Sequence, residues 1–136
     1  MIHLLKINES KNKITDAIDL FRKIKEIKID YSQENFIAFY LDTKNSVIDS
    51  EIVFIGGLDS ALIDIKTLFR KALLKNSAKI IVAHNHPSNE LTPSYEDKEV
   101  FEKLKEAGEI IGLNVLDSII FNEREFYSQI TKWKIN

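Results

Sequence analysis

Hydrophobic residues along the chain follow two kinds of spacing, which together predict helices and strands. Apolar residues recur three and four positions apart over residues 15–27 and Ile65–Leu74, a spacing typical of helices that bury one face. Asn35–Leu41 is a continuous apolar and aromatic run, which is typical of a buried strand. Turn residues at 42–45 separate this run from Val47–Ile55, which we interpret as the returning strand.

The second half of the chain predicts three more strands and a long helix. Residues 79–83 form a short buried strand, and a polar loop follows over residues 84–92. A helix is predicted over residues 93–109, because proline suits a first turn and apolar residues then recur at helical spacing. The last two strands are Asn114–Phe121 and residues 125–130. The apolar residues expected to face the core from the second and third helices are Ile65, Leu68, Phe69, Ala72, Leu73, Val100, Leu104, Ala107 and Ile111.

This order of elements predicts an α/β fold, with a mixed β-sheet flanked by helices. The chain has 136 residues, the size of a single domain, and it contains no repeat or linker, so residues 1–136 are predicted to form one domain. With 19 basic and 21 acidic residues, the net charge of -2 gives no broad cationic field for a phosphate backbone. We therefore expect no nucleic-acid partner for this domain alone.

Two absences in the sequence narrow the function further. The chain has no cysteine, which excludes disulfides, thiol nucleophiles and cysteine-ligated zinc sites. Its longest apolar run, at residues 36–41, is far too short to span a membrane, and its N-terminus is too polar for a signal peptide. We expect a cytoplasmic protein without membrane association.

Candidate chemistry is concentrated around two histidines. His84 and His86 stand two positions apart, where a buried strand is predicted to end. Residues i and i+2 of an extended chain point to the same side, so both imidazoles can face one point. We interpret the solitary His3 as an ordinary surface or core residue.

Ser94 and Asp97 stand three positions apart and therefore share one face of a helix. By itself this pair is an ordinary helix start, whose main role is capping, although capping and metal ligation can coexist. A loop that folds back brings Asp97 to the point that His84 and His86 face. Two imidazole nitrogens, one carboxylate and a fourth position for water make an open, catalytic kind of zinc site.

The joint pattern of His84, His86 and Pro87, followed by Ser94 and Asp97, resembles the signature of the JAMM (MPN-plus) metalloproteases. Residues 80–94 are similar to the RadC branch of that superfamily, and further similarity covers about residues 14–130. The resemblance implies a JAMM/MPN-like layered architecture of the cytidine-deaminase kind. It also implies the short, stand-alone form, without the helical domain that precedes the JAMM domain in full-length RadC proteins.

Two positions depart from the RadC pattern. Asn89 stands where glycine is usual, and because asparagine tolerates left-handed backbone, we expect the loop to keep its shape. Ser118 stands where a histidine is usual, so any accessory role of that histidine is absent here.

The resemblance further implies a catalytic glutamate just before the strand that follows the first helix. Glu34 occupies that place, although without the family it would be interpreted as a solvated loop acid. In the family this glutamate is the base that activates the water held by zinc. The resemblance thus predicts a zinc-dependent hydrolase of peptide or isopeptide bonds, with a peptide or protein as substrate. The expected catalytic residues are Glu34 and Ser94, and the expected Zn²⁺ ligands are His84, His86 and Asp97.

Two functions other than hydrolysis are also compatible with parts of the sequence. A JAMM-like fold can be retained as a non-catalytic or DNA-repair-associated binding module that keeps the metal site. The complete set of metal ligands favours a catalytic site over a binding module that has lost activity. The string His84-Asn85-His86 also suggests an HNH nuclease, but that motif is spread over a ββα-metal hairpin, whereas here the three residues are consecutive.

Overall fold

The computed structural model describes residues 12–56 and 64–130, together with the backbone of residues 134–135. The described strands form one six-stranded sheet in the order β2-β1-β3-β4-β5-β6. β3 and β4 run parallel and all other neighbours antiparallel, so the sheet is mixed, as predicted. The strands are β1 (Asn35–Leu41), β2 (Val47–Ile55), β3 (Lys79–Asn85), β4 (Asn114–Phe121), β5 (Phe126–Ser128) and β6 (Lys134–Ile135).

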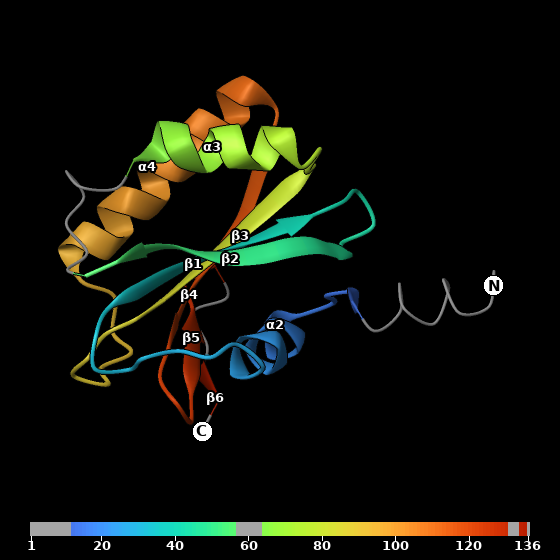
Figure 1. The fold of residues 1–136 in the computed structure, drawn as a ribbon. Coiled ribbons are helices and arrows are strands. Elements are labelled where there is room, and N and C mark those ends of the chain that lie inside the picture. Colours follow the sequence, from blue (N-terminus) through green and yellow to red (C-terminus); the bar gives the residue numbers. More distant parts are fainter. Residues whose placement is uncertain (1–11, 57–63, 131–133, 136) are drawn as a thin grey trace, which may run out of the picture.

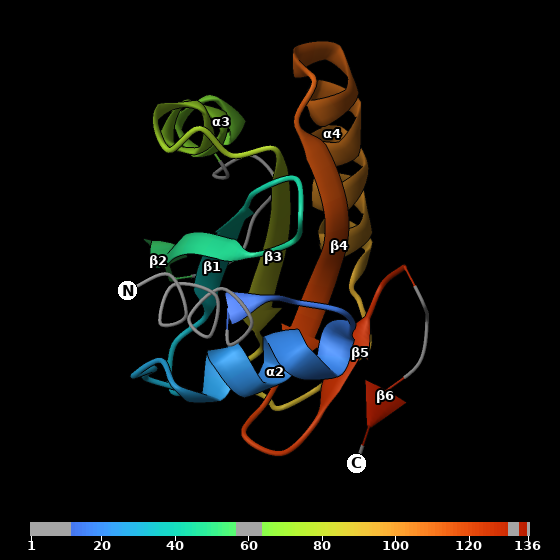
Figure 2. The same cartoon turned by 90° about the vertical axis from the view of Figure 1, so that its right-hand side faces the viewer.

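Helices cover both faces of this sheet, which confirms the α/β class. α2 (Ala17–Lys25) packs on one face, and α3 (Ile65–Leu74) and α4 (Tyr95–Ile111) lie on the other (Figure 1, Figure 2). α4 connects β3 to its parallel neighbour β4, as a crossover helix must when two parallel strands are adjacent. The C-terminal end of the central strand β3 and the start of α4 therefore lie close together.

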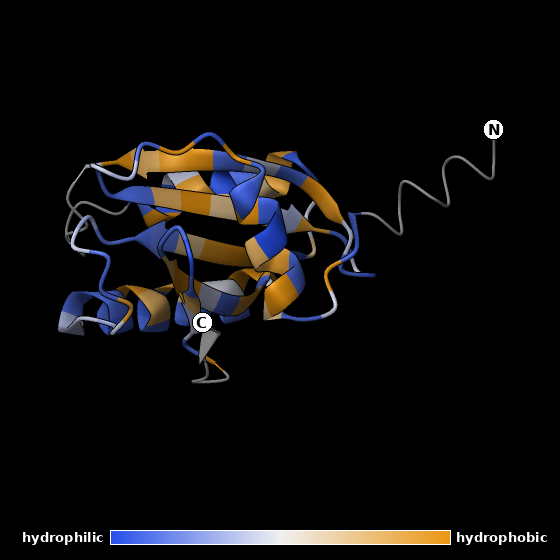
Figure 3. Ribbon diagram, turned by 90° about the horizontal axis from the view of Figure 1, so that it is seen from below, coloured by the Kyte–Doolittle hydropathy of each residue, from blue (hydrophilic) through white to orange (hydrophobic). Residues whose placement is uncertain are grey.

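The alternation of side chains along the strands divides the core into two layers. The side chains of Phe36, Ala38 and Tyr40 in β1 belong to the layer under α3 and α4. Those of Ile37 and Phe39 belong to the layer under α2. Because both faces are covered, the central strands are apolar along most of their length, whereas the helices carry both hydrophobic and polar residues (Figure 3).

Local side-chain contacts define where the helices begin and end. Asp16 caps α2 by accepting a hydrogen bond from the backbone N–H of Asp19 at 2.9 Å. Asn76 follows α3 with a left-handed φ of 56°, in keeping with the predicted helix stop. No helix among the described residues is long and apolar enough to cross a bilayer.

The predicted ends of several elements were wrong. β3 was expected to stop at Ala83, but it includes His84 and Asn85, which pair with β1 and with β4. α4 begins only at Tyr95, because Ser94 is its N-cap and the preceding proline lies outside the helix. The last predicted strand, 125–130, is shorter and spans Phe126–Ser128.

Two residues assigned to helical core faces were also placed wrongly. Leu73 is 53% exposed and Ile111 is 46% exposed. Each lies in the last turn of its helix. Phe101, which was not assigned to the core face of α4, is 5% exposed and packs in that layer.

Candidate metal centre

The end of β3 directs two histidines to the face of the sheet that α4 covers. His84 has the same strand parity as Ile80 and Val82, which face α3 and α4. Its ring is 1% exposed and stacks on Phe36 of β1, with ring centroids 6.2 Å apart. His86 lies two residues further on, and its ring centroid is 5.1 Å from that of His84.

The start of α4 brings a carboxylate to the same place. Ser94 Oγ accepts a hydrogen bond from the backbone N–H of Asp97 at 3.1 Å, and Asp97 Oδ2 accepts one from the backbone N–H of Ser94 at 2.8 Å. This reciprocal pair is a capping box, and it fixes the first turn of the helix. Asp97 is only 3% exposed, so the cap holds a buried carboxylate directed at the histidines.

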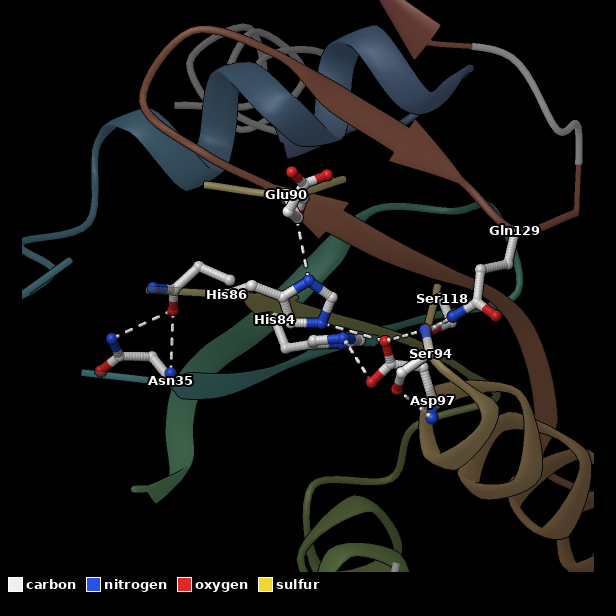
Figure 4. A network of polar contacts seen from close by, with 9 residues as sticks. Asn35, His84, His86, Glu90, Ser94, Asp97, Ser118 and Gln129 are labelled. Carbon is white, nitrogen blue, oxygen red and sulfur yellow. Dashed lines mark hydrogen bonds and ion pairs between the residues drawn. The ribbon is translucent and has the colours of Figure 1, made fainter. Parts of the chain in front are cut away.

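The three side chains converge on one point (Figure 4). His84 Nε2 lies 3.0 Å from Asp97 Oδ1, and His86 Nε2 lies 2.9 Å from Asp97 Oδ2. One ligand atom from each residue falls within 4.8 Å of the others. A tetrahedral zinc ion with bonds of ~2.0–2.1 Å separates its ligand atoms by ~3.3 Å, which is close to this spacing.

Electrostatics in this cluster favour a cation. Burial alone would raise the pKa of the Asp97 carboxyl, but the close contacts of Asp97 with His84 and His86 outweigh burial and hold that pKa well below its usual range. The hydrogen bond to Asp97 raises the pKa of His86 against the opposing effect of burial, and the carboxylate of Glu34 adds to the rise. The cluster therefore keeps an ionised carboxylate beside two ring nitrogens.

The tautomer of His86 is set by the loop that follows it. His86 Nδ1 is 2.8 Å from the backbone carbonyl oxygen of Glu90, which can only accept, so Nδ1 carries a proton. Nε2 is then the nitrogen that faces Asp97 and is available to a metal.

The residues present fit a bound metal ion. His84 is almost fully buried, yet among the described residues neither of its ring nitrogens has a hydrogen-bond partner of acceptable geometry. The short contact of His84 Nε2 with Asp97 Oδ1 is an approach of two groups without hydrogen-bond alignment. A cation between them satisfies both, since buried polar atoms otherwise require partners. Two imidazoles and one carboxylate are the ligand set of catalytic rather than structural zinc sites.

Comparison with models of protein families identifies the family to which the chain belongs. The model of the RadC-like JAB domain matches residues 12–133, which include the whole described site. The chain belongs to the RadC-like JAB domain family. The resemblance of the histidine, serine and aspartate pattern to the RadC branch is thereby confirmed.

Relatives of this RadC-like JAB domain are found in archaea and bacteria. The UPF0758 protein of Methanosarcina mazei is 38% identical over 122 residues, which cover 90% of this chain and 53% of the relative. That of Halalkalibacterium halodurans is 42% identical over 110 residues, covering 81% of this chain and 47% of the relative. That of Geobacillus thermodenitrificans is 44% identical over 97 residues, covering 71% and 43%. The chain thus spans about half the length of these curated relatives.

The loop of the JAB domain that joins His86 to α4 departs from the RadC pattern at Asn89. Asn89 has a φ of 67°, so asparagine supplies the left-handed backbone for which the branch usually has glycine. Asn122, at the end of β4, donates a side-chain hydrogen bond to the carbonyl oxygen of Asn89 at 3.0 Å. Ser118, which stands where the branch usually has a histidine, accepts a hydrogen bond from Gln129 at 2.8 Å (Figure 4).

Glu34 lies next to the cluster, on the neighbouring strand. It immediately precedes β1, in which Phe36 pairs with His84, and continuing this register places Glu34 opposite His86. Glu34 also has the strand parity of Phe36, so it falls on the face that carries the two histidines.

Two contributors to the site of this JAB domain were missed by sequence reasoning. The carbonyl of Glu90 orients His86, and a backbone atom leaves no mark in a residue pattern. Asn85 was named only within the string His84-Asn85-His86, whereas its side chain binds the backbone of Gln33 and Asn35 on either side of Glu34. Strand parity was the signal that could have found it, because a residue between two ligands must face the other way.

Proposed function

We propose that this domain is a zinc-dependent amide hydrolase that acts on peptide or isopeptide bonds. The observation that carries the proposal is the convergence of His84, His86 and Asp97 at the edge of the sheet, in a donor set that leaves one coordination position for substrate or water. The substrate would be a peptide or a protein.

The three ligands would hold the ion between β3 and α4. When bound, zinc supplies a Lewis acid that polarises an amide carbonyl and brings the pKa of water close to neutrality. Asp97 offsets part of the positive charge, and its contacts with His84 and His86 keep it ionised despite its burial.

Glu34 would act as the general base and acid. In this role its carboxylate accepts a proton from the attacking water and later passes the proton to the leaving amine nitrogen. Its position opposite His86 and its electrostatic effect on that histidine support the assignment. The backbone carbonyl of Glu34 accepts a hydrogen bond from Gly56 N at 2.8 Å, which ties the residue to the end of β2.

Other carboxylates fit this role less well. Glu96 is exposed on the first turn of α4, about 100° around the helix from Asp97. Glu90 is exposed and contributes its carbonyl, not its side chain, to His86. Glu51 accepts a hydrogen bond from Tyr40 and pairs with Lys71, away from the ligands.

Ser94 would stabilise the oxyanion that forms when water attacks the amide. Its oxygen accepts from the Asp97 backbone, so its hydroxyl proton remains for donation to another group. The N-terminus of α4 adds a partial positive charge beside the same position, which also favours a developing anion.

The decisive experiment measures metal content and hydrolysis together. Protein purified without chelator and supplied with zinc should contain close to one zinc per chain by elemental analysis, and it should cleave members of a peptide and isopeptide library. Glu34→Gln should keep the zinc and the fold but lose ~10²–10⁴-fold in activity, since an amide cannot accept the proton.

Glu90→Gln is the matched control and should stay close to wild type, because the carbonyl that orients His86 is unchanged. If Glu90→Gln were inactive and Glu34→Gln active, the base would be misassigned. Stoichiometric zinc with no cleavage of any substrate in the library would favour the binding-module alternative.

A further inference from the structure

We propose that Asn85 is a positioning residue that holds Glu34 in place from the far side of the sheet. This inference rests on the proposed function, because it concerns the residue assigned there as the base. It explains why the residue between the two histidine ligands is an asparagine, a side chain that offers both a donor and an acceptor.

The contacts of Asn85 lie on the two residues that flank Glu34. Asn85 Oδ1 accepts a hydrogen bond from the backbone N–H of Asn35 at 2.8 Å. Asn85 Nδ2 donates to the backbone carbonyl of Gln33 at 2.8 Å. One amide group therefore binds the main chain immediately before and immediately after Glu34.

A second asparagine, Asn35, adds to these contacts, and Asn85 and Asn35 together form a clamp on the backbone around Glu34. Asn35 Nδ2 donates to Asn85 Oδ1 at 3.2 Å, to the carbonyl oxygen of Gln33 at 3.0 Å and to that of Asp30 at 2.9 Å. Asn35 is 2% exposed and Asn85 is 1% exposed, so the pair is shielded from water. Buried hydrogen bonds of this kind hold their geometry, because no solvent competes for them.

The clamp lies on the opposite side of the sheet from the chemistry. His84 and His86 face α4, and the residue between them must face α2. Asn85 therefore does not contribute to the ligand set. The pairing of β1 with β3 ends at Phe36 and His84. Beyond that pair the side-chain amide of Asn85 connects the two chain segments through its hydrogen bond to the carbonyl oxygen of Gln33.

One strand end thus fixes both halves of the site. Residues 84–86 present the two histidines on one face and the asparagine on the other, so two of the three ligands and the position of the base depend on the same three residues. The distance between a base and its proton donor is critical, and a misplacement of ~1 Å costs ~10²-fold in rate. Asn85 acts on catalysis only through Glu34.

The first test is structural and does not depend on turnover. Crystal structures of zinc-loaded wild type and zinc-loaded Asn85→Ala should show the metal on the same ligands and the Glu34 carboxylate displaced in the variant. A carboxylate that keeps its place in Asn85→Ala would overturn the proposal. If Asn85→Ala does not fold, Asn85→Asp replaces it, because the isosteric acid keeps the acceptor for Asn35 but loses the donor to Gln33.

The second test is a double-mutant cycle on hydrolysis. In wild type, Asn85→Ala should lower kcat by ~10–100-fold with little change in KM. In a Glu34→Gln background the same change should lower kcat by less than about twofold, since the residue it positions no longer acts. Equal losses in both backgrounds would indicate a merely structural role and would contradict the proposal.

Asn122→Ala is the matched control for this cycle. Asn122 is also a buried asparagine, with bonds to Asn89, Arg124 and Glu125, but it does not contact the segment of Glu34. Any loss it causes should be the same in both backgrounds. Wild-type protein without hydrolytic activity would contradict the proposed function, and the crystal structures would still decide the role of Asn85.

Discussion

His86 is the residue at which protons and metal compete most directly. Its Nδ1 is committed to the Glu90 carbonyl, and its Nε2 faces Asp97. A proton on Nε2 and a metal ion on Nε2 exclude each other, so the affinity of the site for metal depends on the pKa of this ring.

We expect zinc affinity to fall as the pH falls, beginning above the ordinary histidine value of 6.5. The folded pKa of His86 is raised, chiefly by its hydrogen bond to Asp97, so the ring takes up a proton at a higher pH than a free histidine does. Asp97, with its lowered pKa, stays ionised throughout. Below the raised pKa the zinc dissociation constant should increase ~10-fold per pH unit.

Competition with a chromophoric chelator between pH 8 and pH 5.5 measures this dependence. Glu90→Ala should give the same curve, because the carbonyl that binds His86 belongs to the backbone. An affinity that stays constant down to pH 5.5 would contradict the expectation.

A residue pattern can predict a functional residue when the side chain itself is the functional group. His84 and His86 could be identified from the two-residue period of a strand, and Asp97 from its place in a helix-start signature. The Glu90 carbonyl could not be identified, because every residue has one. The role of Asn85 depends on the pairing partner of β3, which a local pattern does not contain.

At the scale of the elements, the capping box of α4 is part of the site as well as of the helix. Ser94→Ala removes the cap and should lower the free energy of unfolding by ~1 kcal/mol. Ser94→Gly should lower it by only a few tenths of a kcal/mol, because glycine is tolerated at an N-cap. Both variants lack the hydroxyl, so both should lose ~10²–10³-fold in kcat if Ser94 donates to the oxyanion.

Urea unfolding and steady-state kinetics on the same samples separate the two roles. Ser94→Thr keeps a hydroxyl and serves as the control, with near wild-type stability and activity. If activity followed stability across the series, with Ser94→Gly retaining most of its kcat, the role of Ser94 would be capping alone.

At Gly108 the crossover helix packs directly against the chain that enters β4. A Cβ added there would lie 2.2 Å from the carbonyl oxygen of Leu113 and 3.2 Å from a methyl group of Val115. We expect Gly108→Ala to lower the free energy of unfolding by ~1–2 kcal/mol, because the clash with backbone exceeds the gain in helix propensity. Urea unfolding measures the change.

Glu109→Ala, at the exposed neighbouring position, should stay within ~0.5 kcal/mol of wild type. A Gly108→Ala protein as stable as wild type would show that the backbone after α4 can move aside.

Elements were predicted best where polar turns mark both of their ends. The bounds of β1, β2 and α3 match their predicted ranges, because apolar runs and polar turns coincide with the ends of these elements. β3 was predicted too short, because His84 and Asn85 are polar and were read as a loop. Both are buried, and partners in other elements account for their polarity.

At the scale of the whole molecule, the metal centre is separate from what holds the fold together. Two hydrophobic layers, one on each face of the sheet, contain the large buried side chains, and neither includes the three ligands. Stability should therefore survive loss of the metal.

We expect chelated protein to remain folded but to melt at a lower temperature. Zinc at a free concentration of one hundred times its dissociation constant adds about 2.7 kcal/mol to the native state. For a domain of this size that corresponds to a shift of ~5–10 °C in Tm. Calorimetry with and without chelator measures the shift, and His84→Ala should show none.

Far-ultraviolet circular dichroism provides the check on folding itself. Chelated protein should keep its spectrum at room temperature. Cooperative unfolding on addition of chelator would show that the ion is structural, as in zinc modules that fold only around their metal.

The two-residue period at the end of β3 also determines where the chain can change in length. One residue inserted before His84 would turn both imidazoles toward α2 and place the asparagine among the ligands, since a one-residue slip exchanges the two faces of a strand. The loop after His86 lies outside the sheet, with exposed residues at Ser88 and Asn89. Insertions and deletions among homologues should therefore avoid β3 and collect around residues 87–89, ahead of the Glu90 carbonyl that orients His86 and of the buried Leu91.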